Sequence, residues 1–214
     1  MNCEVIDIEE KKVLKRAAAG DEAAFEQLVL QYQSSIYNLC LRITGNAEDA
    51  ADMTQESFLK AWRSLESFHF ESAFSTWLYR LASNTCLDFL RSVKRHKQVS
   101  LTVEDDDGQT QLLDVPDPAP TPEAALLSQE KHELLAAAMQ RLDPEQRRIL
   151  TLRVVNGLSY TEIAAVLDVK EGTVKSRLAR ARENLRNKLL QSGNKADAKA
   201  SNRQNRKGGR GNVQ

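Results

Sequence analysis

Cysteine is scarce in this chain, and its spacing excludes two kinds of small stabilised protein. Cys3, Cys40 and Cys86 are odd in number and contain no C-x-x-C pair, so neither a disulfide framework nor a zinc knuckle is expected. Cys40 and Cys86 lie in helical patterns, where we expect them to fill the core. The three histidines also lack the spacing that is typical of metal ligands. The sequence therefore predicts no metal site and no cofactor.

Long apolar runs are missing as well. No run approaches the roughly 20 apolar residues of a membrane span. The first 12 residues are acidic, whereas a secretory signal is basic and then apolar. We therefore expect a cytoplasmic protein without direct membrane insertion. The alternating pattern of strands is absent too, and 41% hydrophobic content in 214 residues is enough for one or two helical cores.

Net charge is zero, because 30 basic side chains balance 30 acidic ones, but the charge is unevenly distributed. Residues 96–128 carry 1 basic and 7 acidic side chains, whereas residues 129–190 carry 12 and 8, and residues 191–214 carry 6 and 1. An acidic segment thus precedes a basic C-terminal part. Such a distribution is compatible with nucleic-acid binding by that part.

Helical periodicity organises residues 1–95. Asp21 can cap a long helix whose apolar rhythm stops at Gly45, and the next helix is expected to begin near Asn46. A further helix is predicted from about Thr76 to Arg95. We interpret residues 1–95 as one small helical domain.

Residues 96–124 are predicted to be a flexible acidic and proline-rich linker. Periodicity stops there, and proline stands at every second position from Pro116 to Pro122, which favours an extended path. Helical patterning resumes over residues 125–190, where Asp143 and Pro144 can begin a helix. Together with residues 1–95, this predicts an all-α fold of two small helical domains.

The last 24 residues, 191–214, contain no Leu, Ile, Phe or Trp, so we expect a disordered basic tail. Two interpretations of this tail remain open. It either adds phosphate attraction that fades with salt, or it is an appendage without a specific partner.

A helix-turn-helix is predicted within residues 158–189. Ser159 and Glu162 form an S-x-x-E capping box for a short helix, Gly172 is placed in the turn, and Thr173 is expected to cap a second helix. One face of the second helix is apolar. The other face carries Lys175, Ser176, Arg177, Arg180 and Arg182. A charged face alone is often only solvated, but the capped helix, turn and basic helix together favour DNA recognition in a major groove.

The predicted helix from Thr76 supplies a second candidate site. At steps of three and four it places Trp77, Arg80, Asn84, Asp88 and Arg91. The preceding loop adds phenylalanines 68, 70 and 74. Aromatic rings beside amides suit single-stranded DNA, because stacking contributes about 1 to 3 kcal/mol per base. The alternative is that these rings belong to the hydrophobic core.

Three segments resemble a known family. NAEDAADMTQESFLKAWRSL, SAFSTWLYRLASNTCLDFLR and GLSYTEIAAVLDVKEGTVKSRLARARENL closely resemble the extracytoplasmic-function (ECF) group of bacterial RNA polymerase sigma factors. The resemblance covers about residues 10–95 and 125–190, in the order of the family's regions 2 and 4. It implies a promoter-specificity subunit that binds core RNA polymerase and promoter DNA and catalyses nothing. It also implies a stress or envelope response and control by an anti-sigma factor.

The resemblance further implies three sets of site residues. The helix that docks on the polymerase contributes Asp52, Gln55, Glu56, Leu59 and Trp62. The minus-ten element, with a flipped base, is assigned to Lys60, Phe68, Trp77, Tyr79, Arg80, Asn84 and Asp88. The minus-thirty-five element is assigned to Lys175, Ser176, Arg177 and Arg180, with Ser159, Tyr160 and Thr161 near phosphates.

Asp88 departs from the family pattern, because other members can place a neutral amide there. A carboxylate would repel phosphate or select a cytosine amino group.

Two other classes of function also remain to be tested. The first is an operator-binding repressor or activator, which would shift DNA without polymerase. The second is a DNA enzyme such as a recombinase, which would need a nucleophile and its activators; no such cluster stands out.

Overall fold

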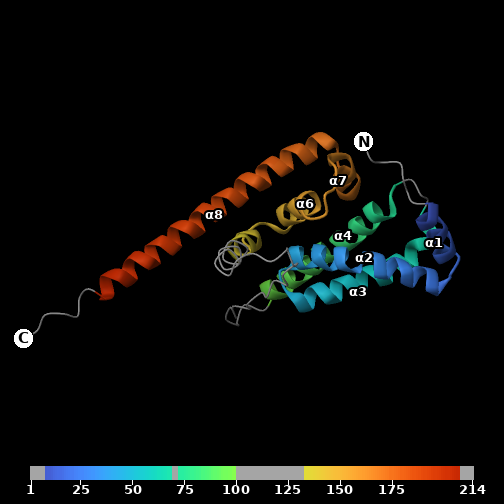
Figure 1. Ribbon diagram of the computed structural model, residues 1–214, viewed down its shortest axis with the longest axis horizontal. Helices are drawn as coiled ribbons and strands as arrows, with labels where there is room; N and C mark the ends of the chain where they lie inside the picture. The colour runs from blue at the N-terminus through green and yellow to red at the C-terminus, as the bar shows by residue number, and fades with distance from the viewer. Residues whose placement is uncertain (1–7, 69–71, 100–132, 208–214) are drawn as a thin grey trace, which may run out of the picture.

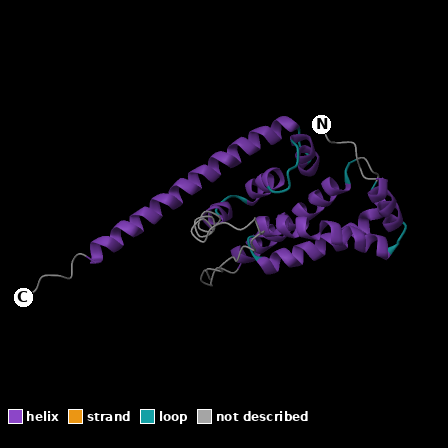
Figure 2. Cartoon of the chain, viewed as in Figure 1, coloured by secondary structure: helices purple, strands orange, loops and turns teal. Residues whose placement is uncertain are grey.

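The structure is a computed structural model that describes residues 8–68, 72–99 and 133–207. Every regular element in these residues is helical, as Figure 2 shows, and the predicted all-α class is confirmed. Most of the expected linker, residues 100–124, lies outside the described residues. The first half of the chain contains α1 (Ile8–Ala18), α2 (Glu22–Thr44), α3 (Ala47–Ser64), the short η1 (Leu65–Ser67) and α4 (Phe74–Val99).

Helices α2, α3 and α4 pack against one another, and α1 packs against α2 (Figure 1). The apolar faces meet at fully buried side chains such as Leu28, Ile36 and Leu78. Cys40 on α2 and Cys86 on α4 are both 0% exposed, which confirms the expectation that they fill the core. The outer face of α3 stays exposed, as at Asp52, Gln55 and Leu59.

The predicted helix boundaries arise from local capping. The Asp21 carboxylate accepts a hydrogen bond from the backbone N–H of Ala24 at 3.1 Å, and the Asn46 side chain accepts from the N–H groups of Glu48 and Asp49. Gly45 ends α2 with φ at +82°, a left-handed conformation that glycine adopts without steric cost. Helix α4 is longer than predicted at both ends. It begins two residues before Thr76 and continues past Arg95 to Val99.

The second half contains a helical segment at residues 133–140, then α6 (Pro144–Val154), α7 (Tyr160–Leu167) and α8 (Glu171–Lys207). Helix α6 begins as expected, with Asp143 as cap and Pro144 in the first turn. Helices α6 and α7 pack against the start of α8, while the remainder of α8 extends away from the other helices (Figure 1). Leu152, Ile163 and Leu178 are buried where these helices meet.

The turn of the helix-turn-helix differs from the prediction. Asp168, not Gly172, adopts the left-handed conformation at the turn, with φ at 53°. Helix α8 already begins at Glu171, so Gly172 and Thr173 lie in its first turn. Aspartate is among the few residues that tolerate this conformation, because its short side chain can bond locally. The glycine was the stronger sequence signal but is not needed there.

The C-terminal segment also differs from the prediction of a disordered tail from residue 191. The backbone of α8 continues as a helix to Lys207. Residues 191–207 include several Ala, Lys, Arg and Gln residues, all of which favour helix. Extending an existing helix avoids the unfavourable nucleation step, so a segment that cannot build its own core can still continue α8.

The two halves are in contact. Helix α6 packs against α2 and α4, and α7 packs against α4. Gly45, at the end of α2, lies so close to Gln140 that a methyl group on the glycine would overlap the glutamine amide. Gln140 in turn accepts a hydrogen bond from Arg147 of α6. The buried apolar residues of both halves consequently form one cluster.

Candidate nucleic-acid interface

The short helix α7 is fixed by the predicted capping box. The Ser159 hydroxyl accepts from the Glu162 backbone N–H at 3.2 Å, and the Ser159 N–H donates to the Glu162 carboxylate at 2.7 Å. The two side chains thereby bond to backbone N–H groups that would otherwise have no partner at the first turn of α7. The capping box is confirmed, and it sets where α7 begins relative to α8.

The first turns of α8 present a cationic face to solvent. The side chains of Lys175, Ser176, Arg177 and Arg180 are all exposed. Lys175 pairs with Glu171 at 2.9 Å, and this contact raises the pKa of Lys175 while it lowers the pKa of Glu171. Within the described part of the chain, Arg177 and Arg180 form no ion pair. Their guanidinium groups are therefore available to an anionic partner.

The start of α7 lies beside this face. The Tyr160 ring has Arg153 5.1 Å from its centroid and Lys175 5.9 Å from it. The Thr161 hydroxyl is 3.4 Å from the Glu171 carboxylate. The structure thus brings the seven residues assigned to the minus-thirty-five element to one end of the helix-turn-helix. Such a surface can hold phosphates at α7 and reach base edges from α8.

Helix α4 provides a second polar face. Arg80, Asn84 and Asp88 recur every four residues and are exposed. Asp88 pairs with Arg91 at 3.1 Å, which offsets the negative charge that distinguishes this position. Lys60 reaches this region from α3, where its amine donates to the Thr85 hydroxyl at 3.3 Å.

The aromatic candidates lie elsewhere. Phe68 is 8% exposed and Tyr79 is 9% exposed, so both are buried. Trp77 is half-buried, with its ring centroid 5.3 Å from that of Phe68 and 5.6 Å from that of Phe74. This packing matches the alternative of core aromatics. The assignment of Phe68, Trp77 and Tyr79 to base contacts stays a prediction, and it requires the rings to leave part of this packing.

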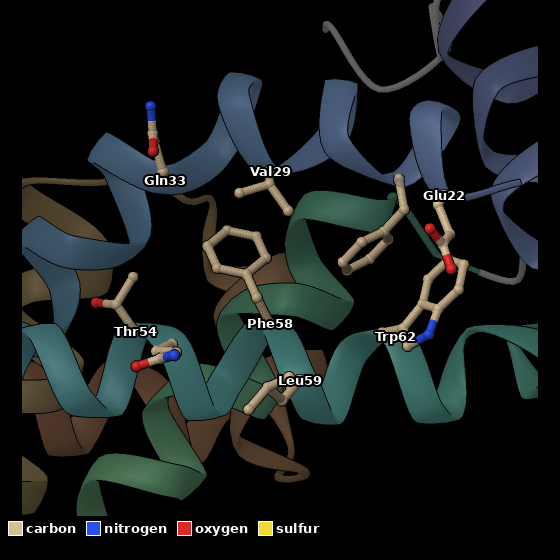
Figure 3. Close-up of a pocket in the computed structure, with 9 residues that line it drawn as sticks. Glu22, Val29, Gln33, Thr54, Phe58, Leu59 and Trp62 are labelled. Carbon is tan, nitrogen blue, oxygen red and sulfur yellow. The ribbon is translucent and has the colours of Figure 1, made fainter.

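An apolar groove lies between α2 and α3, as Figure 3 shows. Its volume is about 430 Å³, and its walls include Phe25, Val29, Phe58, Leu59 and Trp62. Leu59 is 44% exposed although it is a large apolar residue. Two of these lining rings contact each other, with 4.8 Å between the ring centroids of Phe25 and Trp62. An amphipathic helix fits a groove of this kind.

The five residues assigned to polymerase binding are only partly gathered by this groove. Gln55, Leu59 and Trp62 line it. Asp52 is exposed beyond the lining, and Glu56 pairs with Lys60 at 3.4 Å. The sequence reasoning missed the wall formed by Phe25 and Val29, because their helical spacing also suits a core face.

Arg148 was also missed. It is only 5% exposed, and burial lowers its pKa to about 10. One of its amino groups donates to the Asn84 side-chain oxygen at 2.9 Å and to the Val166 carbonyl at 3.3 Å. An arginine next to another arginine is more typical of a solvated helix face. Nothing in the sequence signals that it lies between the two halves.

No group of three or more His, Cys, Asp or Glu side chains among the described residues is arranged to hold a metal ion. None of the helices in these residues combines the length and apolar character that a bilayer crossing requires.

Comparison with known proteins identifies both helical units. Residues 28–96 match the family description Sigma-70 region 2, and residues 132–185 match Sigma-70, region 4. The chain is 39% identical to the ECF RNA polymerase sigma-E factor of Haemophilus influenzae over 184 residues, which cover 84% of this chain and 95% of that protein. It is 40% identical to the RNA polymerase sigma-H factor of Pseudomonas aeruginosa, with coverage of 82% and 91%.

Solved structures agree with this relationship. CnrH in complex with the cytosolic domain of CnrY has a TM-score of 0.60 at 25% identity, over 86% of this chain and 97% of that one. The sigma factor RpoE of Bartonella quintana, in complex with the anti-sigma factor NepR, has a TM-score of 0.61 at 25% identity, over 78% and 96%. The chain belongs to the extracytoplasmic-function group of bacterial RNA polymerase sigma factors.

Proposed function

We propose that this chain directs core RNA polymerase to its promoters through three separate surfaces. The groove lined by Gln55, Leu59 and Trp62 docks on the polymerase. The exposed face of α4 binds the minus-ten element, and the start of α8 reads the minus-thirty-five element. The chain itself catalyses no reaction, and it acts in the cytoplasm where polymerase and promoters are found.

One observation carries this proposal. A single chain combines an exposed cationic helix-turn-helix with a separate apolar groove on another helical unit. The cationic face suits a phosphate-rich duplex, where Arg177 and Arg180 can reach base edges. The groove suits a protein partner, because burying an exposed leucine and a half-buried tryptophan is favourable against an apolar helix.

Control by an anti-sigma factor in a stress or envelope response is part of the same proposal. A structural relative is bound to the anti-sigma factor NepR. An inhibitor that covers the groove would block polymerase docking without contacting DNA. We therefore expect such a partner to compete with polymerase for the surface around Leu59.

A binding experiment distinguishes this function from that of an operator-binding regulator. Purified chain, purified core polymerase and the two together are incubated with labelled promoter fragments, and complexes are separated on a gel. The proposal expects polymerase to form a promoter-specific complex only when the chain is also present. A sequence-specific complex with the chain alone, unchanged by polymerase, would instead support a repressor or activator.

A further inference from the structure

The exposed face of α4 is engaged by the chain's own second half. Arg80 pairs with Asp168, at the end of α7, at 3.8 Å. Arg91 pairs with Glu145 of α6 at 3.3 Å. Between these two pairs, the Asn84 amide oxygen accepts the hydrogen bond from Arg148.

Each contact uses a group that nucleic acid would need. Guanidinium groups bind phosphate oxygens through the geometry that they use for carboxylates. Asp168 and Glu145 therefore occupy Arg80 and Arg91 as phosphates would. The Asn84 amide oxygen, which could accept from a base amino group, is taken by Arg148. A strand laid along α4 would also meet α6 and α7, which pack against that helix.

These contacts bind the two halves weakly. The side chains of Arg80 and Arg91 are 49% and 63% exposed, and exposed ion pairs contribute little net stability. Arg148 is buried, yet its Nε has no hydrogen-bond partner among the described residues, and its ion pair with Glu145 is long, with 3.9 Å between Nη1 and the carboxylate oxygen. A buried cation with incomplete pairing regains hydration when it is released. These polar contacts consequently cost little to break.

The two DNA-binding faces differ in this respect. Arg177 and Arg180 on α8 point to solvent and have no partner within the described residues. The α4 face, in contrast, has a partner from the second half at Arg80, Asn84 and Arg91. The closed chain can therefore present its duplex-reading helix while its face for the minus-ten strand is engaged.

We propose that Asp168, Glu145 and Arg148 act as an internal competitor of the minus-ten strand, so that the free chain is closed and must open before α4 binds DNA. This inference rests on the proposed function for the identity of the strand. The contact itself is a property of the free chain. The contact in the free chain and the competition with the DNA strand can be tested separately.

The test variant removes the two carboxylates in Glu145→Gln/Asp168→Asn. Asparagine tolerates the left-handed conformation of residue 168, so the turn is preserved. The control, Glu9→Gln/Glu26→Gln, changes net charge equally at exposed positions on α1 and α2. Asp168→Asn alone serves as a second test variant, because that side chain is 86% exposed and its removal leaves the core intact.

Small-angle X-ray scattering of the full chain tests closure without DNA. At low salt, the parent and the control should be compact, and the double variant should have a larger radius of gyration. The parent should expand as salt screens its exposed pairs. A parent radius equal to that of the double variant at every salt concentration would overturn the proposal.

Fluorescence anisotropy then tests competition. The probes are a labelled single strand copied from the non-template minus-ten region of a promoter mapped by run-off transcription, and a labelled duplex of its upstream element. The double variant should bind the single strand about three- to tenfold more tightly than the parent, because a larger fraction of it is open. Its affinity for the duplex should change less than about twofold, since the α8 face is already free.

Equal tightening on both probes, matched by the control variant, would show a general charge effect and overturn the proposal. Unchanged single-strand affinity would overturn it as well. If the parent supports no promoter-dependent transcription but its scattering responds as expected, the proposed function fails and the closed contact stands. If transcription is promoter-dependent but scattering and affinity do not respond, only the internal competitor fails.

Discussion

Arg180 provides the sharpest test of DNA reading at the level of one residue. Its guanidinium is exposed and forms no ion pair within the described residues. Removing the side chain should therefore change the free energy of unfolding little. Arg180→Ala should weaken promoter binding by about 1 to 3 kcal/mol if the side chain contacts a base. Transcription rates on promoters with matched and scrambled upstream elements measure this effect.

Arg186→Ala is the matched control for Arg180, because Arg186 lies farther along α8 and pairs with Glu183. Equal losses for Arg180→Ala on matched and scrambled promoters would assign Arg180 to phosphate contact. A loss for Arg186→Ala as large as that for Arg180→Ala would mean that charge on α8, not position, matters.

Ser159 tests whether the capping box holds the helix-turn-helix. Ser159→Ala removes the acceptor for the Glu162 N–H and should lower the free energy of unfolding by about 0.5 to 2 kcal/mol. Urea denaturation followed by circular dichroism measures this change. Ser67→Ala is the control, because among the described residues that exposed hydroxyl bonds only to the Ser64 carbonyl. Equal effects of the two substitutions would contradict a capping role for Ser159.

Asn84 tests the assignment of α4 to the melted strand. Asn84→Ala should reduce open-complex formation more than closed-complex binding, because a flipped base loses an amide contact that offsets its unstacking cost of a few kcal/mol. Permanganate footprinting measures melting, and a gel shift at low temperature measures closed-complex binding. Normal melting in the variant would remove Asn84 from the minus-ten site.

At the level of elements, the groove between α2 and α3 makes the strongest prediction. Leu59→Ala removes an exposed apolar side chain from its wall and should weaken core-polymerase binding by roughly 1 to 3 kcal/mol while thermal stability changes little. Leu30→Ala is the control, since Leu30 is 62% exposed on α2 but does not line the groove. Equal polymerase affinity of the two variants would exclude the groove as the docking surface.

The elements themselves were largely predictable because capping is local. Asp21, Asn46, Asp143 and Ser159 each bond to backbone groups within three residues, so their signals are complete in the sequence. The turn before α8 was misplaced, because aspartate can substitute for glycine in a left-handed conformation. The helical continuation to Lys207 was missed, since hydrophobic content does not report on extension of an existing helix.

The candidate sites were predictable to different degrees. The exposed face of α8 follows from helical spacing alone. The groove needed the position of α2 beside α3, which brings Phe25 to within 4.8 Å of Trp62 between ring centroids. Phe68 and Tyr79 show the limit of a composition argument, because rings that could stack on bases can also fill the core, and both rings are buried here.

For the whole molecule, the contact between the halves could not be predicted from the sequence. Arg148 and Asn84 are 64 residues apart, and Arg91 and Glu145 are 54 apart, so no local pattern joins them. In the sequence, these charged side chains have the pattern that is typical of solvated helix faces. Only their placement in the fold makes carboxylates of the second half partners for arginines of the first.

The central claim is that this chain gives promoter specificity to core RNA polymerase, and run-off transcription tests it most directly. Core polymerase is incubated with fragmented genomic DNA and nucleotides, with and without the purified chain, and the 5′ ends of the RNA are mapped. We predict new start sites that depend on the chain and share two upstream elements at constant spacing. If the start sites are the same with and without the chain, the claim is contradicted.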